Sequence, residues 1–306
     1  MEYVLQTKGL TKRYKGYNAV DNIDMHIKKG EIYGFLGQNG AGKTTTLRLL
    51  TGLIKPTSGE IELFGQPLQQ NKTKVFERIG STIEYPGFYN NLTVTEVLEI
   101  HLYLMGVNEK RVVGEIINKV GLITVKNKKV EELSLGMKQR LGIARALSHQ
   151  PELLILDEPM NGLDPAGIKE IRNLIYHLAI DNNMTVLMSS HILSEVQQIA
   201  TKIGIISKGK LIEEISKEEL DKKNQQYINL KVDDNLKAIR VLEEKLLIKE
   251  FKVFNDETIR IYERTSDVSL INRALIEEEV EIQSSNVAGA SLEEYFLQKT
   301  GGEFNV

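Results

Sequence analysis

Residues 31–46 read EIYGFLGQNGAGKTTT, and the segment from Gly37 to Thr44 decides the fold. It fits the spacing G-x-x-x-x-G-K-[ST], which is typical of a loop that wraps a polyphosphate between a strand and a helix. An apolar strand is expected at residues 31–37, and TTTLRLLTGL continues with helical spacing. The alternative is a glycine-rich turn with a solvated lysine. The flanking strand and helix favour a phosphate-binding loop, because its glycines allow backbone N–H groups to point inward.

Each polar residue of this loop has an expected contact with a nucleotide. Lys43 can reach the β- and γ-phosphates, the Thr44 hydroxyl can bind Mg²⁺, and Thr45 can reach the α-phosphate. The nucleotide-binding residues predicted here are Gly37, Gln38, Asn39, Gly40, Ala41, Gly42, Lys43, Thr44 and Thr45.

A second chemical motif is LLILDEP at residues 153–159. The apolar run predicts a buried parallel strand that ends at two carboxylates. Asp157 suits the Mg²⁺ shell, and Glu158 can polarise an attacking water. A pair of solvated carboxylates at a strand end is the alternative. Beside a phosphate loop, the motif instead predicts a nucleotide hydrolase.

Length and composition limit the other functions. The chain has 306 residues, a net charge of -3 and no cysteine. This length suits one large domain and a small one. The charge gives no reason to expect nucleic-acid binding, and the absence of cysteine excludes disulfides and thiolate metal sites. No apolar run approaches the roughly 18 residues that span a bilayer. We therefore expect no nucleic-acid partner and no direct membrane insertion.

The hydrophobic pattern restarts after a charged segment at residues 216–226. Beyond it, strands and helices are expected in the order β-α-β-β-α-β, which is typical of a ferredoxin-like α+β unit. A capping box, SLEE, predicts one more helix at residues 291–299. We therefore expect a first domain at residues 1–220 and a small α+β domain at residues 226–306.

A second anion-attracting helix start lies in ELSLGMKQRLGIARAL, where Ser134 and Gly136 open a basic helix. The segment LSLGM resembles the LSGGQ signature of ABC ATPases. Other landmarks of that family stand in order along the chain. Tyr14 matches the aromatic residue that stacks on adenine, Asp164 belongs to the loop NGLD that lies near the nucleotide, and His191 matches the switch histidine.

The resemblance covers residues 1 to about 215 and implies an α/β P-loop NTPase fold with a helical subdomain at about 85–140. In that family two such domains pair head to tail around two ATP molecules, so Ser134 and Gly136 would serve the nucleotide of the partner. The implied cofactors are ATP and Mg²⁺. The implied partners are a second copy or a related ATPase and an integral membrane permease, on the cytoplasmic side of the cell membrane. The catalytic residues carried over by the resemblance are Lys43, Glu158 and His191.

Three positions depart from the general family pattern. Leu135 and Met137 replace a glycine and a glutamine of the signature. Glu84, in IGSTIEYPGFYNN, stands where a glutamine usually touches Mg²⁺. A glutamate there resembles the E-loop of bacitracin-resistance and lantibiotic-immunity transporters, which implies export of a peptide antibiotic. The metal-binding residues implied are then Thr44, Glu84 and Asp157.

Other readings of the sequence remain open. A non-transport ABC ATPase acting on ribosomes or DNA would share the fold, although the chain lacks the second cassette or the long coiled-coil insertion usual in those groups. An ATP-dependent sensing module is a further alternative, against which Glu158 and His191 argue. The aromatic residues Tyr85, Phe88 and Tyr89 suit a docking surface and a packed core equally well.

Overall fold

The computed structural model describes residues 3–70, 72–107, 110–223, 226–254 and 258–288. The chain divides into two compact units, Met1–Lys217 and Glu218–Val306. The division falls inside the charged segment at which the sequence pattern restarts. The helix expected at residues 291–299 lies outside the described residues.

A six-stranded sheet forms the centre of the first unit. Its strands lie in the order β11 (Lys210–Ser216), β10 (Lys202–Ser207), β4 (Ile32–Leu36), β9 (Thr185–Ser190), β8 (Leu153–Leu156) and β7 (Ile79–Thr82). All neighbours run parallel except β10 and β11, which form a hairpin. Strands β4 and β8 are buried along their whole length, which explains their continuous apolar sequences.

A second, antiparallel sheet packs on the first. It consists of β2 (Tyr17–Ile23), β1 (Tyr3–Tyr14), β5 (Ser58–Leu63) and β6 (Gln66–Pro67), with β3 (His26–Lys28) also paired to β1. Side chains from both sheets and from the first helix share one apolar core, which includes Leu5, Leu63, Phe35, Leu47 and Ile155. This shared core fixes the start of the first helix between the two sheets.

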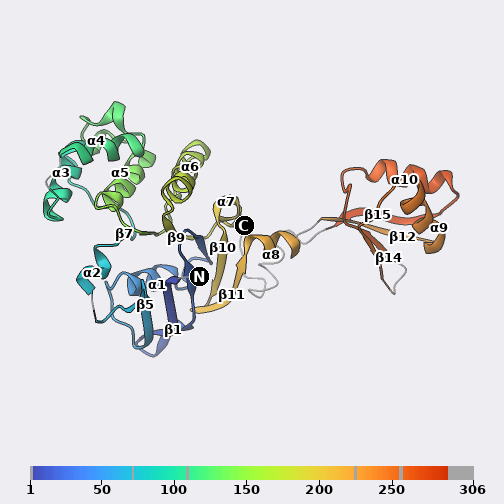
Figure 1. Cartoon of the computed structure of the whole chain (residues 1–306), viewed down its shortest axis with the longest axis horizontal. Coiled ribbons are helices and arrows are strands. Elements are labelled where there is room, and N and C mark those ends of the chain that lie inside the picture. The colour runs from blue at the N-terminus through green and yellow to red at the C-terminus, as the bar shows by residue number, and fades with distance from the viewer. Residues whose placement is uncertain (1–2, 71, 108–109, 224–225, 255–257, 289–306) are drawn as a thin grey trace. The chain divides into compact units, whose positions relative to one another are not determined.

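Helices connect the strands of the first unit. They are α1 (Lys43–Leu50), α2 (Lys72–Phe76), α3 (Val94–Leu104), α4 (Lys110–Lys119), α5 (Leu135–Leu147), α6 (Pro165–Asn182) and α7 (Leu193–Ile199), and α8 (Lys217–Lys223) begins at the division. Figure 1 shows α3, α4 and α5 gathered as a helical group away from β1 and β5. Thr93 and Glu96 form the capping box that starts α3. Helices α3 and α4 and the start of α5 lie in the range expected for the helical subdomain, about 85–140, and α5 continues beyond it to Leu147.

The second unit has the predicted β-α-β-β-α-β order. Its elements are β12 (Tyr227–Val232), α9 (Asn235–Arg240), β13 (Phe251–Val253), β14 (Thr258–Ile261), α10 (Val268–Glu277) and β15 (Ile282–Ala288). The strands form an antiparallel sheet in the order β13-β14-β12-β15. A π-helical turn, Val241–Lys245, extends α9. The unit has its own apolar core, which includes Ile228, Leu230, Ile259, Ile261 and Leu275. This element order and this antiparallel sheet are those expected of a ferredoxin-like unit.

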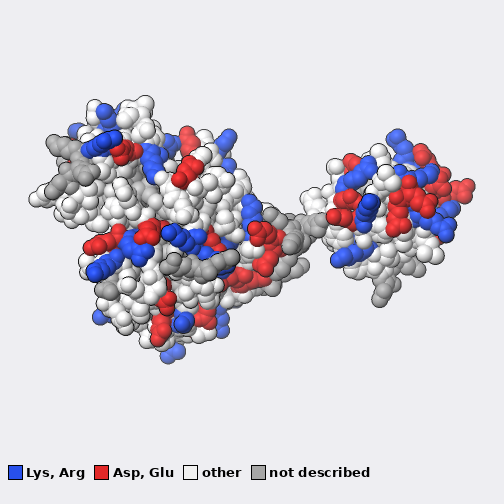
Figure 2. Space-filling model, in the orientation of Figure 1, with Lys and Arg blue, Asp and Glu red and all other residues white. Residues whose placement is uncertain are grey.

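On the face shown in Figure 2, basic and acidic side chains are interspersed on both units. Within the described residues, no helix combines the length and the apolar character needed to cross a membrane.

Candidate nucleotide-binding site

The loop from Gly37 to Thr44 joins the buried strand β4 to helix α1. Gly40 and Gly42 have φ angles of 81° and 109°, which favour glycine. A Cβ atom on Gly42 would lie 2.5 Å from the carbonyl oxygen of Ala19, so only glycine fits there. Because the first N–H groups of a helix have no partner inside it, the start of α1 offers donors to an anion.

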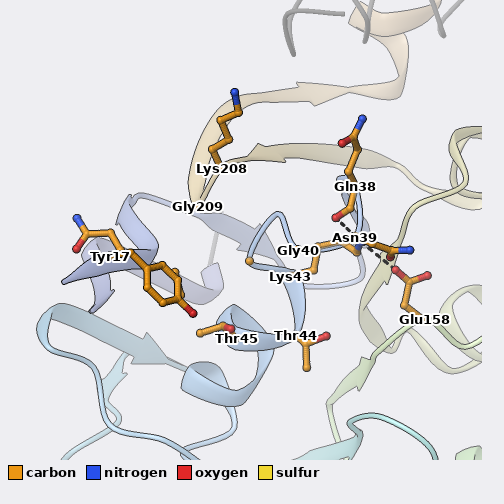
Figure 3. A pocket seen from close by; sticks show the side chains of 13 residues that line it. Tyr17, Gln38, Asn39, Gly40, Lys43, Thr44, Thr45, Glu158, Lys208 and Gly209 are labelled. Carbon is orange, nitrogen blue, oxygen red and sulfur yellow. Dashed lines mark hydrogen bonds and ion pairs between the residues drawn. The ribbon is translucent and has the colours of Figure 1, made fainter. Parts of the chain in front are cut away.

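A cavity of about 520 Å³ opens beside this loop. Its lining comprises Tyr17, Asn18, Ala19, Gln38, Asn39, Gly40, Gly42, Lys43, Thr44, Thr45, Glu158, Lys208 and Gly209. Figure 3 shows the Lys43 side chain reaching Glu158, with Thr44 and Thr45 at the start of the helix that follows the loop. Gly37 and Ala41 are buried and support the loop without lining the cavity. The cavity therefore collects most of the residues that the phosphate-loop pattern selected.

The cavity includes residues that no sequence motif indicated. The turn at Lys208 and Gly209 joins β10 to β11, and the Gly209 N–H donates to the carbonyl oxygen of Ala41 at 2.9 Å. The N–H of Asp21 donates to the Gly209 oxygen at 2.8 Å. These bonds close the turn onto both the phosphate loop and β2. Nothing in the sequence indicates that this turn reaches the phosphate loop.

Lys43 is a buried cation with three oxygen partners. Its side chain is 5% exposed, and Nζ donates to the carbonyl oxygens of Gly37 at 2.6 Å and Gln38 at 3.1 Å. Nζ also lies 3.0 Å from Glu158 Oε1. A buried charge is tolerated only when it is paired. A nucleotide phosphate could replace the carboxylate as the partner of this ammonium group.

The carboxylates after β8 are organised by neighbouring strands. Asp157 is buried, and its Oδ1 accepts a hydrogen bond from Ser189 Oγ at 2.6 Å. The Glu158 N–H donates to the same Ser189 Oγ at 2.9 Å. Glu158 Oε2 lies 2.8 Å from His191 Nδ1. Glu158 Oε1 is buried and, although it forms the ion pair with Lys43, has no aligned hydrogen bond. Apart from the contact with Lys43, this oxygen therefore has unused capacity to accept hydrogen bonds.

The oxygen donors of the cavity fit Mg²⁺ held together with a nucleotide. Thr44 lines the cavity, and Asp157 lies at the carboxyl end of β8. Within the described residues, no group of three or more histidine or carboxylate side chains could hold a metal without other ligands. Mg²⁺ usually takes one or two carboxylates and completes its shell with phosphate oxygens and water. This small set of donors agrees with that chemistry.

Glu84 lies outside the lining of this cavity. Its side chain is 59% exposed, and its Oε1 forms an ion pair with Arg48 Nη2 on α1. The expected contact of Glu84 with Mg²⁺ stays a prediction. The contact with Arg48 could not be read from the sequence, since the two residues lie 36 positions apart.

Ser134, Gly136 and Asp164 also lie outside the cavity of their own chain. Ser134 is the exposed N-cap of α5 and accepts a hydrogen bond from the Met137 N–H at 3.3 Å. Asp164 caps α6 and accepts from the Gly167 N–H at 3.0 Å. Within one chain these residues act as helix caps, and their expected contact with nucleotide stays a prediction.

The aromatic residue that lines the cavity is Tyr17, whereas Tyr14 does not line it. The two residues face each other across β1 and β2, with ring centroids 6.3 Å apart. The Tyr17 side chain is 63% exposed and that of Tyr14 is 37% exposed. Figure 3 shows the Tyr17 ring near Thr45. The hairpin therefore offers two candidate rings for adenine, and the sequence pattern selected only Tyr14.

We expect Tyr17→Ala to weaken ATP binding by about fivefold or more, because stacking of a base on an aromatic ring contributes about 1–3 kcal/mol. Tyr17→Phe should retain wild-type affinity, since it keeps the ring. Titration with a fluorescent ATP analogue measures both variants. Tyr14→Ala is the matched comparison. A large loss for Tyr14→Ala with none for Tyr17→Ala would assign the adenine contact to Tyr14 alone.

This fold and this cavity define a P-loop nucleotide-binding ATPase. The ABC transporter family model matches residues 20–161. The chain is 50% identical over 302 residues to the uncharacterized ABC transporter ATP-binding protein YcbN of Bacillus subtilis (strain 168), covering 99% of this chain and 98% of that protein. The chain belongs to the ATP-binding proteins of ABC transporters, and it is an ATPase that works in transport.

Two further relatives have names that state what they transport. The bacitracin transport ATP-binding protein BcrA of Bacillus licheniformis is 47% identical over 302 residues, and the match covers 99% of each chain. The lantibiotic transport ATP-binding protein SrtF of Streptococcus pyogenes is 44% identical over 209 residues, covering 68% of this chain and 89% of that protein.

Solved structures of ABC cassettes have the same fold. The chain is similar to cbiO1 from Clostridium perfringens, part of the ABC transporter complex cbiONQ, with a TM-score of 0.67 and 26% identity over 81% of this chain and 98% of that one. It is also similar to the dimeric post-hydrolysis state of the cassette MJ0796 bound to ADP and Pi, with a TM-score of 0.63 and 25% identity over 69% of this chain and 98% of that one.

Proposed function

We propose that the chain is the ATP-hydrolysing subunit of a transporter that expels a peptide antibiotic of the bacitracin or lantibiotic type. It acts at the cytoplasmic side of the membrane through a separate permease. The observation that carries the substrate class is the 47% identity to BcrA over 302 residues, which extends through both units of this chain. The glutamate at position 84 supports the same subgroup.

The cavity supports hydrolysis by positioning and charge. When ATP binds, the Lys43 ammonium group pairs with the β- and γ-phosphates instead of with Glu158. The Glu158 carboxylate is then free to orient the attacking water. His191, 2.8 Å from Glu158, holds that carboxylate in place. Thr44 and Asp157 would hold Mg²⁺, which would supply positive charge next to the phosphates. Positioning and charge stabilisation are sufficient because the phosphoryl transition state is loose.

The incomplete site of a single chain supports a head-to-tail dimer. Ser134 and Gly136 stand at the start of the basic helix α5, where Ser134 is exposed, yet neither lines the cavity of its own chain. In the proposed dimer they bind the γ-phosphate held by the partner, and Asp164 lies beside the same interface. Either a second copy or a related ATPase could supply the other half.

An exposed apolar surface on the helical group supports docking of a permease. Tyr85 and Tyr89 are exposed, so they are not core residues. Beside them, a cavity of about 170 Å³ is lined by apolar residues together with His101 and Arg145. Burial, together with the smaller effects of the Arg145 and His149 charges, lowers the pKa of His101 to about 4. Because this imidazole is neutral near pH 7, the surface suits an apolar partner segment.

We expect cells that carry the chain and its permease to resist a bacitracin-type peptide, and cells with Glu158→Gln to lose that resistance. The reason is that export requires ATP turnover. The measurement is the minimal inhibitory concentration, which should fall by about the full factor that the wild type confers. Glu60→Gln, an exposed carboxylate on β5, is the matched control and should keep resistance.

The same cells separate this proposal from the other classes of ABC ATPase. Cosedimentation of the wild-type chain with ribosomes, without any change in peptide resistance, would favour a ribosome-acting ATPase. Resistance that survives Glu158→Gln would favour a sensing module in which ATP binding is sufficient.

A further inference from the structure

Glu84 and Glu158 follow the carboxyl ends of two neighbouring parallel strands of the central sheet, and they occupy equivalent places there. Strands β7 and β8 are parallel neighbours, with Thr82 opposite Leu156. Each glutamate comes two residues after its strand, and the Asp157 N–H donates to the Thr82 carbonyl oxygen at 2.9 Å. Both glutamates have positive φ angles, 62° and 48°, which are unusual for this residue type. Glu84 therefore leaves the sheet beside the carboxylates of the nucleotide site.

Arg48 holds the Glu84 carboxylate close to the expected metal ligand Thr44. Arg48 and Thr44 are four residues apart on α1, so their side chains are neighbours on one helix face. The ion pair between Arg48 and Glu84 thus ties the loop after β7 to the first turns of α1. Glu84 therefore lies near the expected metal site, but its carboxylate is paired with Arg48.

The carboxylates at this edge are each compensated by a different group. Glu158 pairs with Lys43, Asp157 accepts from Ser189, and Glu84 pairs with Arg48. Mg²⁺ bound at Thr44 and Asp157 would attract the Glu84 carboxylate away from Arg48, because a divalent cation is the stronger electrostatic partner. The pair is partly open to water, with side chains 38% and 59% exposed, so it can be broken at low cost.

We propose that Arg48 is a positioning residue that competes with Mg²⁺ for the Glu84 carboxylate. Arg48 holds Glu84 off the metal site until Mg²⁺ arrives with the nucleotide, and Glu84 then changes partner. This rests on the proposed function only in taking Mg²⁺ to be bound with the nucleotide at Thr44 and Asp157. It makes the loop after β7 responsive to the metal as well as to the nucleotide.

The test is the Mg²⁺ concentration that gives half-maximal ATPase activity. Arg48→Gln should lower this midpoint by about two- to fivefold, the range of an exposed ion pair. Arg48→Lys should keep the wild-type midpoint, because it keeps a cation for Glu84. In a Glu84→Gln background, Arg48→Gln should change nothing. The same shift in both backgrounds would overturn the proposal, since it would reflect only loss of positive charge near the metal. An unchanged midpoint for Arg48→Gln alone would overturn it too.

A binding measurement gives a second readout that does not depend on turnover. In a Glu158→Gln background, calorimetry compares ATP affinity with Mg²⁺ and with EDTA. Arg48→Gln should raise the affinity measured with Mg²⁺, divided by the affinity measured with EDTA, by about two- to fivefold. This increase should occur only while Glu84 is present. An equal ratio with and without Arg48 would contradict the competition.

The chain offers a matched control at the opposite end of the same strands. Arg78 precedes β7 and forms an ion pair with Glu152, which precedes β8. Arg78→Gln breaks a pair of similar exposure and should leave the Mg²⁺ midpoint unchanged.

Failure of the Arg48 test with intact ATPase activity would remove only this proposal. A wild-type chain without turnover would instead remove the proposed function.

Discussion

Glu158→Gln should slow ATP hydrolysis by about 10²-fold or more, because the loss of a residue that accepts a proton from or orients the attacking water has effects of this size. ATP binding should survive. The glutamine keeps the shape of the side chain, and without its charge Lys43 has no anionic partner other than the phosphates. Phosphate release measures the first effect, and a titration with a fluorescent ATP analogue measures the second.

Two comparisons make this result specific. Glu60→Gln changes an exposed carboxylate away from the cavity and should hydrolyse ATP at the wild-type rate. Lys43→Ala should instead weaken ATP binding itself, since it removes the buried cation. A Glu158→Gln variant that turns over ATP at the wild-type rate would show that another residue orients the water.

Ser134→Arg should prevent the ATP-dependent dimer that Glu158→Gln accumulates. In the proposed dimer, Ser134 faces the γ-phosphate held by the partner, and a bulky side chain there would stop the two chains from closing. Sedimentation velocity with ATP and Mg²⁺ should show a dimer for Glu158→Gln and a monomer for the double variant.

Ser134→Ala is the matched control, because Ser134 also caps α5. Both substitutions remove the cap, which costs about 1 kcal/mol of stability, but only arginine adds bulk. Ser134→Ala in the Glu158→Gln background should therefore still dimerise. A monomer in all three proteins would contradict the head-to-tail arrangement. A dimer in all three proteins would show that the start of α5, where Ser134 lies, is outside the interface.

The local motifs were sufficient to predict the fold and the centre of the site. The phosphate loop requires glycine where the backbone has positive φ, as at Gly40 and Gly42. Fully buried parallel strands require continuous apolar runs, as in β4 and β8. Both requirements act over a few neighbouring residues, so they are visible in the sequence. The order of strands and helices in the second unit follows from periodicity for the same reason.

The contacts between distant segments depended on tertiary structure. The sequence indicated Tyr14 but not Tyr17, because only the pairing of β1 with β2 decides which ring faces the cavity. It also gave no indication of the ion pair between Glu84 and Arg48 that the structure shows. Which side chains meet at the end of a parallel sheet depends on strand register and loop path, and these are set by packing of the whole core.

The sequence by itself determined the phosphate loop, the carboxylates that follow β8 and the family to which they belong, because each is a short pattern with one backbone solution. Only the tertiary structure decided that Lys43 is held by Glu158, that Ser134 and Asp164 cap helices outside the cavity, and that the turn at Gly209 closes onto the loop. The physical reason is the separation along the chain over which each interaction acts. A motif constrains the backbone of its own residues, whereas an ion pair between segments more than 100 residues apart exists only after the sheet has brought them together.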